Sequence, residues 1–185
     1  MIRIFEWIFC VFFGFSAVWG LVFDSFMVYP KWLYPEFVPK VLVWYTEHYK
    51  DPLPLNPPEW LQAFAWCEQL FLVPFSFVAA YAFYKGKQRW IRIPSIIYAT
   101  HVLTMMVAYM YHLFMHDFSK QKYPGPTTSE ERQRLITTIL PFGIIPVLLL
   151  VFMVKEENYG MHGHFTHVPR HHSPSRRSER IAKRD

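Results

Sequence analysis

Cysteine is scarce in this chain of 185 residues, which has only Cys10 and Cys67. Both lie inside apolar segments, so the sequence supports neither a disulfide framework nor a zinc cluster. The sequence also has no Asn-x-Ser/Thr sequon, and glycosylation therefore gives no indication of which loops face a lumen. The two cysteines are most simply interpreted as small, buried apolar residues.

Charge is also sparse, because only 18% of the residues are charged whereas 52% are hydrophobic and 19% aromatic. The net charge of +5 could suggest a nucleic-acid partner. However, the basic residues lie between apolar blocks and near the C-terminus, without a basic stripe interleaved with aromatic residues. We therefore expect no nucleic-acid binding and predict a polytopic membrane protein.

Four apolar runs are long enough to span a bilayer, which predicts an all-α bundle of four transmembrane helices. They cover Trp7 to Phe23 with a continuation to Tyr29, Trp60 to Phe83, Pro94 to Phe114, and Leu135 to Val154. A signal peptide is the alternative for the first run, since Arg3 precedes it. That run exceeds the roughly 7–15 residues of a signal-peptide core, so we interpret it as an uncleaved helix.

The segments between the runs are rich in proline and polar residues. Seven prolines in residues 30–59 exclude a continuous span there. Between them, Val41, Trp44, Tyr45 and Tyr49 have near-helical spacing, which predicts a short interfacial helix anchored by aromatic residues. The last span is expected to begin at Thr127 or Ser129, because acidic residues follow.

The distribution of lysine and arginine predicts the orientation. The side that holds both termini carries twelve of these residues and the opposite side seven. The excess indicates that both termini are cytosolic, although the C-terminal segment supplies much of the difference.

Two acids lie inside the predicted spans at similar depths, Asp24 and Glu68. At 1.5 Å per residue, Glu68 lies roughly 12 Å and Asp24 roughly 9 Å from the same face of the membrane. Ala17 and Gly20 share a helical face with Asp24 and would let another helix approach closely. If the two faces meet, the carboxyls occupy one apolar cavity and share a proton, with Glu68 donating to an ionised Asp24. Such a site could receive a ligand ammonium or hydroxyl.

A simpler interpretation is that Asp24 reaches the interface and Glu68 bonds a carbonyl freed by Pro74. Candidate residues for the wall of a pocket are Phe64, His101, Thr104 and Phe142. His101 has no second ligand four residues away, so we interpret it as a packing residue. The sequence predicts no catalytic residue, metal or cofactor.

Several segments resemble the EXPERA-domain family. They are WYTEHYKDPL (Trp44 to Leu53), PPEW (Pro57 to Trp60), Cys67-Glu68, YAFYKGKQRWIRIPSIIY (Tyr81 to Tyr98) and HDFSK (His116 to Lys120). The resemblance covers roughly residues 5–155 and is closest to the receptor branch. It implies a homodimer in the endoplasmic reticulum, and possibly the nuclear envelope, that binds cholesterol, oxysterols and cationic amphiphilic molecules. It also implies ligand-binding roles for Asp24, Glu68 and Asp51.

The sequence departs from this family in two places. Phe142 stands where the receptors have a phenol, which removes a hydroxyl from the pocket wall. Residues 156–185, with five histidines and a basic run, have no counterpart, and we divide the chain into a membrane domain (1–155) and a disordered cytosolic tail (156–185). Binding of lipid headgroups or metal is the alternative for the tail.

The sterol isomerases of the same superfamily provide an alternative function. They protonate a ring double bond with a membrane-buried acid, and Glu68 could serve as that acid. Because those enzymes draw pocket residues from a fifth helix and this chain has four predicted spans, we interpret it as a binding protein involved in cholesterol homeostasis or trafficking.

Overall fold

The protein is described by a computed structural model that covers residues 2–120, 122–123 and 125–160. These residues form helices and turns and contain no strand. Four helical segments are long and apolar enough to cross a membrane: Ile2–Met27, Glu59–Lys85, Arg89–Met115 and Ser129–Lys155. The predicted all-α fold with four spans is therefore confirmed, and this is a multi-pass membrane protein. The predicted disordered tail lies, from residue 161 onward, outside the described residues.

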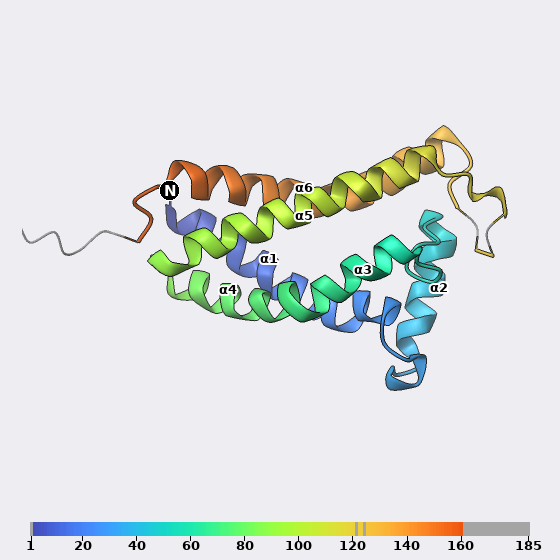
Figure 1. The fold of residues 1–185 in the computed structure, drawn as a ribbon, viewed down its shortest axis with the longest axis horizontal. Coiled ribbons are helices and arrows are strands. Elements are labelled where there is room, and N and C mark those ends of the chain that lie inside the picture. Colours follow the sequence, from blue (N-terminus) through green and yellow to red (C-terminus); the bar gives the residue numbers. More distant parts are fainter. Residues whose placement is uncertain (1, 121, 124, 161–185) are drawn as a thin grey trace, which may run out of the picture.

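The described residues form six α-helices and several tighter or wider turns, and α2 lies between the first and second spans. The elements are α1 (Ile2–Val22), a 3-10 turn (Asp24–Met27), a second 3-10 turn (Lys31–Leu33), α2 (Phe37–Tyr49), α3 (Glu59–Cys67), a π-helical turn (Glu68–Leu72), α4 (Val73–Lys85), a 3-10 turn (Arg89–Ile91), α5 (Arg92–Met115), a 3-10 turn (Phe118–Lys120) and α6 (Ser129–Lys155). In Figure 1 the start of α1 and the end of α6 lie at the same end of the bundle.

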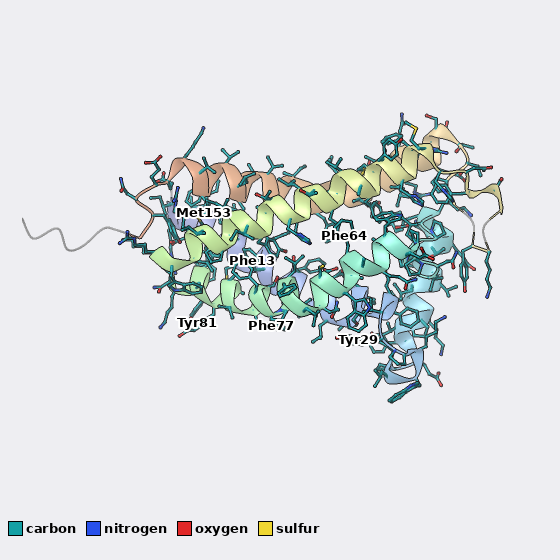
Figure 2. All side chains as sticks on the ribbon, viewed as in Figure 1. Phe13, Tyr29, Phe64, Phe77, Tyr81 and Met153 are labelled. Atoms are coloured by element: carbon teal, nitrogen blue, oxygen red, sulfur yellow. The ribbon has the colours of Figure 1, made fainter. Side chains whose placement is uncertain are left out.

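The bundle consists of two helix pairs that pack most extensively, α1 with α4 and α5 with α6. Phe13 of α1 is fully buried between them. Its ring stacks on Phe83 with centroids 5.6 Å apart and meets Tyr98 of α5 edge-on at 4.8 Å. Aromatic pairs in such offset and edge-on geometries are favourable beyond the area that they bury. These contacts join the two helix pairs into one core near the chain termini (Figure 2).

One expectation about a helix start changes and another is confirmed. The first span begins at Ile2, five residues before the predicted start at Trp7. The last span begins at Ser129, one of its two predicted starts, and its N-cap is Thr128. The Thr128 hydroxyl accepts from the Glu131 backbone N–H at 3.2 Å while the Glu131 carboxylate accepts from the Thr128 N–H at 3.1 Å. This reciprocal pair is a capping box, which satisfies two donors that a helix start leaves free.

The buried carboxylate of Glu6 joins the start of α1 to the turn after α4 and to Tyr159. Glu6 of α1 is 1% exposed, and its carboxylate accepts from the Lys87 backbone N–H at 2.6 Å, the Tyr159 hydroxyl at 2.7 Å and the Arg3 guanidinium at 3.1 Å. Arg3 also donates to the carbonyl of Tyr84 at the end of α4. Sequence reasoning missed this cluster, because Glu6 and Tyr159 lie 153 residues apart in the chain.

Tyr159 shows that ordered packing continues beyond the end of α6. The residue is 3% exposed and its ring meets Phe152 edge-on. Gly160 follows with a φ of 76°, and a Cβ there would lie 2.6 Å from the Arg89 backbone nitrogen. The packed region therefore extends at least to Gly160, five residues past the boundary expected from the sequence.

We expect Tyr159→Phe to destabilise the protein by about 1–2 kcal/mol, because it removes one donor from a buried carboxylate. Thermal unfolding of the purified full-length protein in detergent would measure this. Tyr84→Phe is the matched control, since Tyr84 is 57% exposed. Equal midpoints for Tyr159→Phe and the wild type would show that the hydroxyl does not stabilise the fold.

Candidate ligand-binding site

A cavity of about 310 Å³ lies between the helices at the end of the bundle away from the described termini. All three predicted acids, Asp24, Glu68 and Asp51, line it. Most of its wall is aromatic or aliphatic and comes from α1, α2, α5 and α6, for example Trp19, Phe23, Val102, Met105, Met106 and Phe142. A concave, mostly apolar space with a few convergent polar groups is typical of a site for a small molecule.

Asp24 and Glu68 meet in this cavity. Their side chains are hydrogen-bonded to each other, and Trp19 is a second side-chain partner of Asp24. An indole N–H can only donate, whereas two ionised carboxylates have no proton to give. A hydrogen bond between two carboxyls therefore requires that the pair share a proton. The alternative, in which Asp24 reaches the interface and Glu68 bonds a freed carbonyl, does not describe this geometry.

Local backbone irregularity positions both acids. Regular helix ends at Val22, and Asp24 is the first residue of a 3-10 turn. Glu68 is the first residue of the π-helical turn, which precedes the expected distortion at Pro74 by six residues. Single π-turns inside α-helices occur frequently at functional sites. Here the wider turn moves Glu68 out of a regular helical row and toward α1.

Gly20 makes the close approach of α1 to the π-helical turn possible, as the small residues on this face predicted. A Cβ on Gly20 would lie 2.7 Å from a methyl group of Val73 and 3.2 Å from a carboxylate oxygen of Glu68. The carbonyl of Gly20 accepts from the Gln69 side-chain amide at 2.9 Å. Gln69 is 8% exposed, so this bond satisfies a buried polar group in the membrane. Sequence reasoning did not single out Gln69.

Asp51 has a different environment from the other two acids. It is 1% exposed, and its carboxylate accepts from the Tyr109 hydroxyl at 2.6 Å, the Leu53 backbone N–H at 3.1 Å and the Tyr45 hydroxyl at 3.3 Å. Burial raises the pKa of the Asp51 carboxyl, while these donors act in the opposite direction. Because its oxygens already have three partners, Asp51 is suited to hold α2 and α5 around the cavity.

The short helix predicted between the first two spans is α2, and some of its residues also line the cavity. Val41, Trp44 and Tyr45 line the cavity, so α2 forms its roof. The other side of α2 carries Glu36 and Lys40, which form an exposed ion pair at 3.1 Å. Trp44 and Tyr45 therefore contribute to the cavity wall, while Trp44 is also 58% exposed.

Of the four residues predicted for the wall of the pocket, one lines the cavity. Phe142 lines the cavity, whereas the described lining residues do not include Phe64, His101 or Thr104. The Phe64 ring packs edge-on against His101 with centroids 5.9 Å apart, and the Thr104 hydroxyl donates to the carbonyl of Thr100 on its own helix. Whether a residue lines the cavity depends on its position around the helix axis, because only one face of each helix points inward.

The residues of α5 that line the cavity lie on one helical face, because most are three or four positions apart. They are Tyr98, Val102, Met105, Met106 and Tyr109. His101 lies on the flank of this face, and Thr104 lies further round the helix, where it is exposed. Tyr98 and Tyr109 were missed, since tyrosine in an apolar span gives no signal by itself.

Comparisons with known proteins agree with this architecture. Residues 37–153 match the family described as EXPERA (EXPanded EBP superfamily). The chain is 40% identical over 157 residues to sigma intracellular receptor 2 of Xenopus tropicalis, covering 85% of this chain and 92% of that protein. It is 38% identical over 160 residues to the receptors of that name from Homo sapiens and Macaca fascicularis, covering 85% of this chain and 91% of each relative. The chain therefore belongs to the EXPERA family, as a homologue of sigma intracellular receptor 2, and is a membrane receptor or binding protein.

Proposed function

We propose that this protein binds cationic amphiphilic molecules and sterols in the cavity and takes part in cholesterol homeostasis or trafficking. The observation that carries the proposal is the pair Asp24 and Glu68 inside an otherwise apolar space. A sterol or the apolar part of an amphiphile fits the aromatic and aliphatic wall, and a polar head group fits the carboxyl pair. The names of the relatives, which are intracellular receptors, support this assignment.

The carboxyl pair is suited to an ammonium group. In this proposal Asp24 carries the negative charge and Glu68 holds the proton that the pair shares. A ligand ammonium that binds Asp24 replaces lost hydration with a charged hydrogen bond in a medium of low dielectric constant, where such a bond is strong. Glu68 supports the charge by donating its proton to Asp24. A sterol hydroxyl needs only a hydrogen bond and can use either carboxyl.

The cellular setting is part of the same proposal. Residence in the endoplasmic reticulum, and in the nuclear envelope, follows from the family resemblance, as does assembly as a homodimer. Cytosolic termini follow from the excess of lysine and arginine on that side. In this orientation the cavity opens in the half of the membrane that faces the lumen.

We expect Asp24→Asn to abolish binding of cationic amphiphiles, because a neutral amide cannot offset a desolvated ammonium. Removing one partner of a buried charge pair costs about 3–5 kcal/mol, which is at least a hundredfold in affinity. A radioligand assay on purified protein would measure the loss, and a photoreactive sterol should retain more of its labelling.

Glu47→Gln is the matched control, because it removes an exposed carboxylate from the outer side of α2. Its affinity for the same radioligand should equal that of the wild type. Unchanged affinity in Asp24→Asn would refute the site assignment.

Tyr109→Phe tests the role assigned to Asp51. The substitution removes the shortest hydrogen bond of that carboxyl, so we expect a loss of about 1–2 kcal/mol in stability without ligand, together with weaker binding. Thermal unfolding and radioligand affinity are measured on the same samples, with the exposed Tyr111→Phe as control. A variant with wild-type unfolding but lost binding would instead assign Asp51 to direct contact with the ligand.

A sterol isomerase is the alternative, since Glu68 lines a cavity with aromatic walls and would serve there as the proton donor. We expect no product when the purified protein is incubated with a Δ8-sterol and the sterols are analysed by mass spectrometry. Turnover that disappears in Glu68→Gln would establish the enzyme and overturn the assignment as a binding protein alone.

A further inference from the structure

The turn that leads into α2 exposes three large apolar side chains. Trp32 is 80% exposed, Leu33 53% and Phe37 54%. We refer to residues 29–37 as the tip of α2. None of these three residues lines the ligand cavity, so the proposed function leaves them unexplained.

The tip is held in a defined conformation by contacts with neighbouring residues. The Tyr34 hydroxyl donates to the Ser25 hydroxyl at 2.8 Å, and the Tyr34 ring meets Phe26 edge-on at 5.1 Å. Beneath it, Phe26, Val38 and Leu42 form a small buried core. Since the same turn fixes its inward side chains, Trp32 and Leu33 are held in their outward positions.

The position of the tip indicates what covers it. Figure 1 shows α2 lying across the end of the bundle and not along the spans, with the tip extending past α1 and α3. Because the spans cross the bilayer, a helix laid across their ends runs along the membrane surface. Its outer side carries the exposed charged residues Glu36, Lys40 and Glu47, with the partly exposed Val43 among them. The charged residues favour water on this side.

The tip is also continuous with the lipid-facing side of the second span. Tyr29 meets Trp66 of α3 edge-on with centroids 5.5 Å apart, and Trp66 is 44% exposed. In Figure 2, Tyr29 lies along the same edge of the bundle as Phe77 and Tyr81, which are exposed on the outer side of α4. Lipid that covers this edge therefore meets the tip as well.

We propose that the tip of α2 is a membrane anchor, in which Trp32, Leu33 and Phe37 insert between the lipid headgroups and the upper acyl chains. Tryptophan is enriched at this level of the bilayer because its ring is apolar and its N–H can be hydrated. Lys31, whose ammonium lies 5.8 Å from the Phe26 ring centroid, adds a cation beside the headgroups. The occupant is the lipid surface and not a second copy of the chain, because the apolar edge is continuous with the spans.

A fluorescent label attached at residue 33 tests this anchor. Cys10→Ala and Cys67→Ala remove the native thiols, and Leu33→Cys introduces one at the tip. The full chain is placed in lipid nanodiscs, in which both membrane faces are open to water. We expect quenching by lipids with a nitroxide on the acyl chain, and a large loss of quenching by aqueous iodide.

Glu47→Cys, at the other end of α2, is the matched control and should show the reverse pattern. Phe37→Cys provides a second label on the tip, so the result does not depend on the folding of one variant. Iodide quenching at both tip positions equal to that at residue 47 would overturn the anchor. Shielding from both quenchers would also overturn it, and energy transfer between labelled copies would then identify a second copy as the covering surface.

Discussion

The hydrogen bond between Asp24 and Glu68 is the constraint on which the rest of the membrane domain depends. Two carboxyls in a medium of low dielectric constant must hold a proton between them, and each must have a partner. Their helices therefore have to bring them into contact at one depth. Regular helix stops at Val22, Gly20 removes a side chain from the contact, and the π-helical turn begins at Glu68. Each of these three features lies next to the carboxyl pair and allows the two side chains to meet.

The same requirement explains the other buried polar groups. Lipid offers no hydrogen bonds, so Glu6, Gln69 and Asp51 find their partners within the protein. These partners usually come from a distant segment, and each bond therefore also joins two elements. Glu6 joins α1 to the turn after α4 and to Tyr159, and Asp51 joins α2 to α5. The polar groups thereby determine which helices meet, while the aromatic core fills the space between them.

The sequence predicted features that depend on local pattern. The length of the apolar runs indicated four spans, and the matched depth of Asp24 and Glu68 brought the correct two acids together. The sequence could not predict which face of α5 points toward the cavity, because an apolar span has no polar face that marks the outward side. His101 and Thr104 were therefore chosen from the wrong face of the helix. Tyr109 and Asp51 are 58 residues apart, and no local signal connects them. The ligand-binding roles of the acids stay predictions.

Helix α2 joins the chemistry of the cavity to the surface of the membrane. Its inner side supplies Leu42 and Tyr45 to the roof of the cavity, and Tyr45 is tied through Asp51 to Tyr109 in the third span. The apolar residues at its first turn reach outward along the bundle edge. Because α2 follows the tip directly in the chain and also supplies lining residues, contact between the tip and lipid would restrict the position of both α2 and the cavity wall that it forms.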